Sequence, residues 1–142
     1  MITSVFVYGT LQREQSRGGC WPREPLGIRP GYVRGQLFDL GPYPALRCDD
    51  DVDADWVAGE VWSFKAEDIA PTIEELDLIE ETNQPGQFNL YDCCLVRVYQ
   101  SLELTSSVLA LAYQYSNAGA LPGSRRLYSG QGGYVAWPHK DR

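Results

Sequence analysis

The sequence is poor in the residue on which most hydrolases and many metalloenzymes depend. It contains a single histidine, His139, close to the C-terminus. A serine or cysteine triad would need this one residue to be folded back into a site, and a metal centre with two or three histidines cannot form within one chain. If the protein is an enzyme, carboxylates, tyrosines and backbone amides must carry its chemistry.

Cysteine is also scarce, and its spacing indicates no known kind of site. The four cysteines are Cys20, Cys48, Cys93 and Cys94, and no Cys-x-x-Cys pair occurs. This is neither the pattern of a disulfide framework nor that of a zinc site, so we expect free buried thiols, no metal and no cofactor. A redox pair made of Cys93 and Cys94 is disfavoured, because adjacent residues of a strand point to opposite faces.

Basic residues and long apolar runs are lacking as well. The chain has 12 Lys and Arg against 19 Asp and Glu, a net charge of -7, which repels nucleic acids and anionic membranes. No apolar run approaches the roughly 18 residues of a membrane span, and residues 1–8 do not resemble a secretion signal. We expect a cytoplasmic protein that binds neither nucleic acid nor membrane. With 142 residues, 44% of them hydrophobic, one globular domain over residues 1–142 is expected.

The segments between the glycines and prolines are rich in strand-forming residues. We expect strands over 3–8, 32–40, 55–64, 91–99 and 107–115, a loop or short helix over 13–30, and a turn over 41–44. One helix is predicted from Ile69 to about Glu80, with Asp68 as its N-cap and Pro71 in its first turn. The expected fold is α+β, a mixed or closed β-sheet with one or two helices packed on it.

Five aspartates lie between positions 49 and 55. They lack the glycine and glutamate spacing of a calcium-binding loop, so we expect a solvated turn between two strands.

The predicted helix carries the sharpest chemical signal. At 100° per residue, Glu80 falls on the same face as Ile69, Ile73 and Leu76. Burial raises the pKa of a carboxyl group toward neutrality, which suits general acid–base catalysis. The alternative is that Glu80 lies at a frayed helix end and reaches water. Asp77 could orient Glu80 or lie at the surface, and of these we expect the surface position.

A second signal lies where the first predicted strand ends, in the run Val7-Tyr8-Gly9-Thr10-Leu11. Glycine lets the backbone approach a ligand closely, and successive amides can form an anion-binding nest that would fit a carboxylate. Many strands end in Tyr-Gly without binding anything, so the motif alone leaves a structural role open. It is not a phosphate-binding P-loop, because no Gly-Lys-Thr follows.

Taken together, five motifs in order resemble the gamma-glutamylcyclotransferase-like family, which includes the AIG2-like gamma-glutamylamine cyclotransferases. They are VFVYGTL (5–11), GQLFDLGPYPAL (35–46), VAGEVW (57–62), LDLIE (76–80) followed by Tyr91, and AYQY (112–115). Two positions depart from the family's pattern. Glu81 stands where the family often has glycine, and Cys93 stands where many members have arginine.

The resemblance implies a small mixed β-barrel-like sheet with one or two packed helices, enclosing a cavity. It implies release of 5-oxoproline and an amine from a small γ-glutamyl compound, by attack of the substrate's own α-amino group on its γ-carbonyl. In this family pattern Glu80 is the acid and base. The rival hypothesis is a non-catalytic module that binds a small acidic metabolite.

The remaining implied site residues bind the substrate. The backbone amides of Gly9, Thr10 and Leu11 would hold its α-carboxylate. The hydroxyls of Tyr8, Tyr91 and Tyr115 would face its carbonyl oxygen. Tyr43 would shape the cavity mouth, or its ring would only pack a turn. The protein would need no cofactor or metal and would be a monomer or a homodimer.

Overall fold

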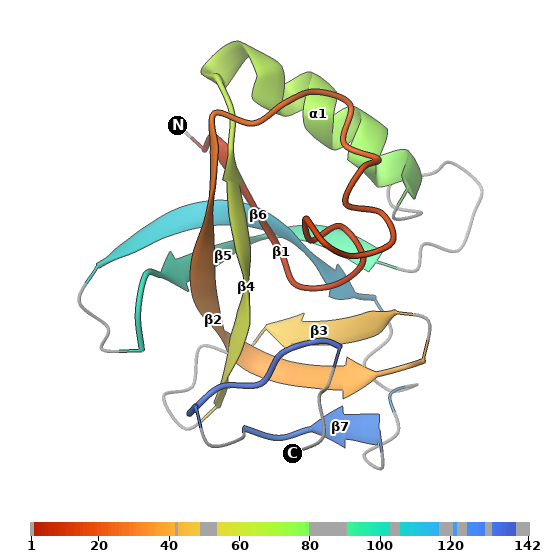
Figure 1. Ribbon diagram of the computed structural model, residues 1–142, viewed down its shortest axis with the longest axis vertical. Coiled ribbons are helices and arrows are strands. Elements are labelled where there is room, and N and C mark those ends of the chain that lie inside the picture. Colours follow the sequence, from red (N-terminus) through yellow and green to blue (C-terminus); the bar gives the residue numbers. More distant parts are fainter. Residues whose placement is uncertain are drawn as a thin grey trace.

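Figure 1 shows a computed structural model of the chain, which describes residues 2–41, 43–48, 54–79, 91–102, 106–116, 121, 125–129 and 132–138. In these ranges the chain forms a seven-stranded sheet and one helix. The strands are β1 (Ser4–Val7), β2 (Gly27–Asp39), β3 (Pro44–Cys48), β4 (Asp55–Ser63), β5 (Tyr91–Tyr99), β6 (Ser107–Tyr115) and β7 (Arg126–Leu127), and the helix is α1 (Ala66–Ile79).

Five of the strands close into a barrel. Their order is β2-β4-β1-β6-β5, and the ring closes where Tyr99 of β5 pairs with Tyr32 of β2. β1 and β6 run parallel, whereas the other neighbours in the ring are antiparallel, so the sheet is mixed. β3 and β7 extend β2 beyond the ring, and α1 lies across one end of the molecule (Figure 1). The predicted α+β fold with a small barrel-like sheet is therefore confirmed.

The strand predictions need correction at β2, β3 and β7. β5 and β6 have the predicted bounds. β2 begins at Gly27 rather than Tyr32, because the whole of β4 pairs with it, up to Ser63 opposite Gly27. β3 was not predicted. It starts directly after the predicted turn with Pro44, and a proline at the first position of a strand is tolerated. The two-residue β7 was also missed.

The helix starts earlier than predicted. It begins at Ala66, so Asp68 lies in its first turn instead of capping it, and Pro71 lies inside the helix. Its first turn is already closed at Lys65, whose carbonyl accepts a bond from the Asp68 amide at 2.9 Å. Among the described residues there is no helix with the length and apolar character needed to cross a bilayer. The described part of α1 ends at Ile79, so the predicted position of Glu80 lies outside the described residues, as does the acidic run at 49–53.

Two apolar clusters make up the core. Alternation along β1 sends Phe6 into the barrel and Val5 and Val7 to the side that faces α1. Leu76 of α1 is completely buried in the second cluster, and Ile69 and Ile73 pack against it, as the helical periodicity predicted. Burying one such leucine contributes about 2 kcal/mol.

The C-terminal segment pairs with the part of β4 that β1 does not reach. β1 pairs with residues 60–63 of β4, and beyond them Val135 bridges to Val57. The amide of Ala58 donates to the Val135 carbonyl, and the Val135 amide donates to the Trp56 carbonyl, each at 2.8 Å. The loop that follows β1 is therefore free to turn away from the sheet and form the site described next.

Candidate functional site

Seven of the eight site residues predicted from the sequence are described, and they gather at one end of the barrel. There β1 ends, β3 and β5 begin, and β6 ends (Figure 1). Glu80 lies outside the described residues. The structure therefore brings the predicted binding residues together and leaves the predicted acid and base as a hypothesis.

The loop after β1 is packed tightly against the start of β3. A Cβ atom added to Gly9 would lie 2.7 Å from Cγ and 2.8 Å from Cδ of Pro44. Only glycine fits this approach without displacing the proline ring. The close contact fixes the position of the loop relative to β3.

The backbone of this loop has its carbonyl groups bound and its amides available. The carbonyls of Gly9, Thr10 and Leu11 accept bonds from the Gln12 amide (3.1 Å), the Arg17 amide (2.7 Å) and the Trp21 indole (2.9 Å), respectively. Within the described part of the chain, the three corresponding amides donate to no other residue. Unpaired consecutive amides are the donors that bind anions such as carboxylates.

Three tyrosines pack together beside this loop. The buried ring of Tyr91 meets Tyr43 at 6.2 Å and Tyr115 at 5.8 Å between centroids, both edge to face. The Tyr91 hydroxyl donates to the Pro44 carbonyl at 2.7 Å. Tyr91 thus ties the start of β5 to the start of β3 and supports the other two rings.

The hydroxyl groups of the candidate tyrosines differ in what they can still bind. Tyr8 donates its hydroxyl hydrogen to the Tyr113 carbonyl, and Tyr91 donates to the Pro44 carbonyl. Tyr43 and Tyr115 are half-buried, and neither hydroxyl has a hydrogen-bond partner among the described residues. Tyr43 and Tyr115 therefore carry the hydroxyls that can face a ligand, and Tyr8 and Tyr91 hold the backbone.

A buried polar pair beneath the site was not predicted. Asp77 is 8% exposed, and its Oδ1 accepts a hydrogen bond of 2.7 Å from the Tyr113 hydroxyl. The expectation that Asp77 lies on the surface is therefore wrong. Its place directly after the buried Leu76 was the available signal, but only the long-range contact with β6 shows that a carboxylate can be accommodated there.

Cys93, which occupies the position of the family's arginine, faces the same region. It lies opposite Tyr113 in the β5–β6 ladder. Burial, followed by the charges of Asp77 and Cys94, raises the pKa of the Cys93 thiol to about 12. Cys93 therefore stays a neutral thiol near neutral pH. In the described residues no group of three or more His, Cys, Asp or Glu side chains is arranged to hold a metal ion.

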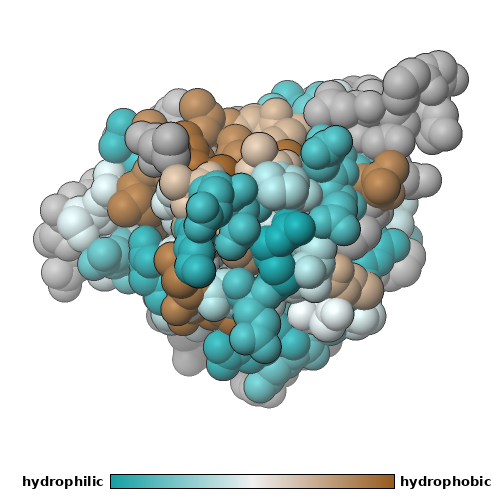
Figure 2. Space-filling model, turned by 90° about the horizontal axis from the view of Figure 1, so that it is seen from above, coloured by the Kyte–Doolittle hydropathy of each residue, from teal (hydrophilic) through white to brown (hydrophobic). Residues whose placement is uncertain are grey.

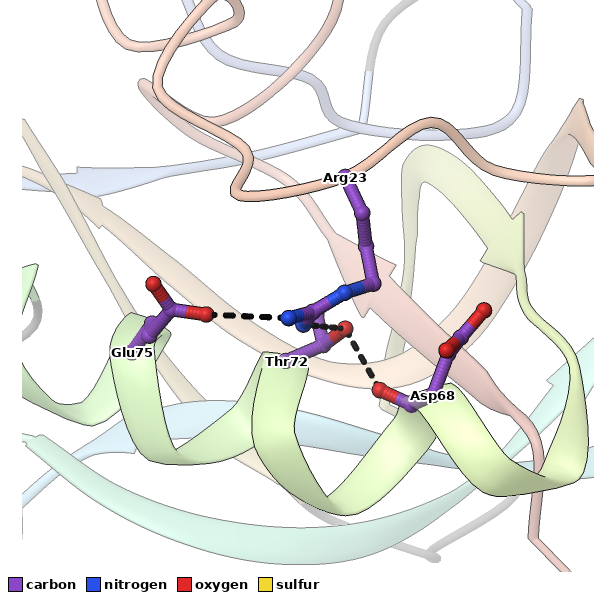
Figure 3. Close-up of polar contacts among 4 residues, drawn as sticks. All are labelled: Arg23, Asp68, Thr72 and Glu75. Atoms are coloured by element: carbon purple, nitrogen blue, oxygen red, sulfur yellow. Dashed lines mark hydrogen bonds and ion pairs between the residues drawn. The ribbon is translucent and has the colours of Figure 1, made fainter.

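Arg23 anchors the loop between β1 and β2 to the helix (Figure 3). Its guanidinium donates from Nη1 to Thr72 Oγ1 at 2.7 Å and from Nη2 to Glu75 Oε2 at 3.3 Å. The Thr72 hydroxyl, fully buried, in turn donates to the Asp68 carbonyl at 2.7 Å. These bonds hold the loop segment that follows Gly9–Leu11 in place against α1.

The face of the molecule above α1 is mostly hydrophilic at its centre, with smaller apolar patches around it (Figure 2). The helix contributes the exposed acidic residues Glu67, Glu74 and Glu75, and Glu75 is paired with Arg23.

A hollow of about 410 Å³ lies elsewhere, between β2, β4, the Gln12–Arg13 segment and the C-terminal segment. None of the site residues predicted from the sequence is among its described lining residues. Its carboxylate, Glu60, accepts bonds at Oε1 from the Arg13 amide (2.8 Å) and the Trp62 indole (3.1 Å). Glu60 therefore holds the loop to β4.

The sequence matches the model of the family described as "Gamma-glutamyl cyclotransferase, AIG2-like" over residues 5–136. No curated protein matches it.

Several solved structures share the fold. An AIG2-like protein from Mus musculus has a TM-score of 0.61 and 22% identity, with 99% of each chain covered. YkqA from Bacillus subtilis has a TM-score of 0.59 and 22% identity over 82% of this chain, which spans only 36% of YkqA. At5g39720.1 from Arabidopsis thaliana has a TM-score of 0.59 and 19% identity, over 96% of this chain and 76% of that one.

Proposed function

The chain belongs to the gamma-glutamyl cyclotransferase, AIG2-like family, and from this premise we propose that it releases 5-oxoproline and an amine from a γ-glutamyl compound. In this reaction the α-amino nitrogen of the substrate forms a bond to its own γ-carbonyl carbon, and the bond from that carbon to the leaving nitrogen breaks. The protein supplies no nucleophile, which suits a sequence with one histidine. The observation that carries the proposal is the row of amides at Gly9–Leu11, which donate to none of the other described residues, beside two tyrosines.

The amides of Gly9, Thr10 and Leu11 bind the α-carboxylate of the substrate. Holding this group fixes one end of the glutamyl chain, so that the chain can fold back and bring its amine to the γ-carbonyl. Positioning of this kind contributes several kcal/mol to the lowering of a barrier, up to roughly 10 kcal/mol in well-oriented systems. The contact between Gly9 and Pro44 supports this role, because it holds the loop in one place.

Tyr115 donates a hydrogen bond to the γ-carbonyl oxygen as negative charge develops on it. Its half-buried hydroxyl has no other partner in the described residues, in contrast to those of Tyr8 and Tyr91. A pre-positioned donor of this kind is effective because it need not reorganise during the reaction. Tyr43, on the other side of Tyr91, lines the entrance.

Glu80 moves the proton. It takes a proton from the α-ammonium group, which frees the amine for attack, and gives it to the leaving nitrogen. This assignment rests on the helical phase of the sequence and on the family resemblance. The hydrogen bond between Asp77 and Tyr113 supports it, because that bond fixes the last turn of α1, three residues before Glu80.

The proposal is tested by incubating the protein with glutathione, γ-glutamyl amino acids, γ-glutamyl-lysine and γ-glutamyl small amines, and measuring 5-oxoproline by mass spectrometry. We expect release from at least one class, and none from the same compound acetylated on its α-amine, because acetylation blocks the nucleophile. Equal cleavage of the acetylated compound would contradict the cyclisation. Ligand-induced stabilisation without release from any compound would favour a binding module.

A further inference from the structure

Two cysteines far apart in the sequence meet between β3 and β5. The Sγ atoms of Cys48 and Cys94 lie 3.8 Å apart, although 46 positions separate the residues in the sequence. Both side chains are half-buried and pack against the apolar interior of the barrel. Neither cysteine is part of a disulfide in this structure.

The surroundings favour the thiolate form of Cys94. The hydrogen bond from Cys48 lowers the pKa of the Cys94 thiol, and the charge of Arg47 and the backbone amide of Gln114 act in the same direction. Burial and the charge of Asp92 oppose this effect without reversing it. The thiolate is the reactive form of cysteine, so Cys94 is the candidate nucleophile, and Cys48 lies next to it.

We propose that Cys48 and Cys94 are a redox-active pair that forms a reversible disulfide between β3 and β5 on exposure to a peroxide. The Cys94 thiolate attacks a peroxide oxygen, giving a sulfenic acid and, after protonation, one water. The Cys48 thiol then attacks the Cys94 sulfur, the S–S bond forms, and the sulfenic oxygen leaves as a second water. Two thiols are oxidised by two electrons, and one hydrogen peroxide is reduced to two waters.

The geometry requires only a small adjustment. A disulfide has its sulfurs about 2 Å apart, so the separation of 3.8 Å must shrink by roughly 1.8 Å. β3 is already tied here to β6, the strand that pairs with β5. Gln114 of β6 accepts a bond from the Cys48 amide through its side chain, and the Arg47 guanidinium donates to the Tyr115 carbonyl at 2.6 Å. Half-buried sulfurs are also within reach of a molecule as small as hydrogen peroxide.

The pair takes no part in the proposed reaction, so its test is independent of the proposed function. The exposed Cys20 is replaced first, in a Cys20→Ser chain, to prevent links between molecules. The folded chain is treated with hydrogen peroxide, alkylated, digested and analysed by mass spectrometry. We expect the three remaining thiols to fall to one, Cys93, with a Cys48–Cys94 crosslinked peptide that dithiothreitol reverses.

Two variants in the Cys20→Ser background sharpen the result. Cys93→Ser keeps the crosslink, because Cys93 is not part of the pair. Cys48→Ser stops at the sulfenic acid of Cys94, which dimedone traps. Full alkylation of both Cys48 and Cys94 after peroxide treatment would overturn the proposal. Over-oxidation of Cys94 without a crosslink, or a crosslink through Cys93, would overturn it equally.

Discussion

The hydroxyl of Tyr113 on β6 donates a hydrogen bond of 2.7 Å to Oδ1 of Asp77 on α1, and both side chains are buried. This contact joins the last turn of the helix to the strand that also carries Tyr115. The two parts of the proposed site, the helix end and the tyrosine cluster, are therefore held in register by one buried polar pair.

Removing the donor of this pair should destabilise the fold. Tyr113→Phe leaves the buried Asp77 carboxyl without this bond, and losses of this kind cost about 1–3 kcal/mol. Urea unfolding should show a lower midpoint with an unchanged m-value. Tyr128→Phe is the matched control. Tyr128 is 62% exposed, so its loss should stay within about 0.5 kcal/mol. Equal midpoints for Tyr113→Phe and the unaltered protein would contradict the structural role.

Gly9→Ala should impair both folding and binding. The new methyl group meets the Pro44 ring at 2.7 Å, and forcing extra atoms into a packed region costs about 1–3 kcal/mol. The displaced loop should also bind γ-glutamyl ligands more weakly, measured by calorimetry. Gly27→Ala is the control, because a Cβ added there has no atom within 4 Å. Unchanged stability and affinity in Gly9→Ala would show that the loop is not fixed by this contact.

Tyr115→Phe should lower the activity, whereas Tyr91→Phe should lower the stability. Tyr115 has no hydroxyl partner in the described residues, so the phenylalanine variant should keep its stability but lose about 10²- to 10³-fold in kcat, the usual effect of deleting a transition-state donor. Tyr91→Phe breaks a 2.7 Å bond to the Pro44 carbonyl and should lose about 1 kcal/mol of stability. Kinetics and urea unfolding of both variants test this contrast. Full activity in Tyr115→Phe would remove Tyr115 from the mechanism.

Cys93 should give the stability a dependence on alkaline pH. Burial, then the charges of Asp77 and Cys94, raises its pKa from 9.0 to about 12. Between these values the unfolded chain has released the thiol proton and the folded chain still holds it, so stability falls as the pH rises through this interval. Urea unfolding across this range should therefore show a steeper fall for the unaltered protein than for Cys93→Ala. Parallel curves would contradict the assignment.

Local patterns in the sequence were enough to predict much of the fold. The strands β5 and β6 are rich in strand-forming residues and their predicted bounds are correct, and the apolar face of α1 is the one that is buried. The Tyr8–Leu11 run and the tyrosines of the site are brought together as the family resemblance implied. The strand and helix predictions depend on signals within about ten neighbouring residues, whereas the gathering of the site residues was implied by motifs spread over residues 5–115.

The missed features depend on contacts between distant segments. The start of β2 contains Gly31, which disfavours strands in isolation, but a Cβ there would lie 2.5 Å from Val98 and 2.7 Å from Val61, so the packed barrel requires glycine. Asp77 is buried because Tyr113, on β6, supplies a donor. The meeting of Cys48 and Cys94 likewise depends on the closure of the barrel. No local pattern contains these partners.

The most direct test of the proposed mechanism compares Glu80 with a carboxylate of α1, Glu74. Glu80→Gln and Glu74→Gln are each assayed for 5-oxoproline release from the best γ-glutamyl substrate of the unaltered protein, after circular dichroism has confirmed that both are folded. Glu74 is exposed and serves as the control, so Glu74→Gln should retain full activity. If Glu80 transfers the proton, Glu80→Gln should lose at least about 10²-fold in kcat, as expected when a general acid–base group is removed. Full activity in Glu80→Gln would contradict the proposed mechanism.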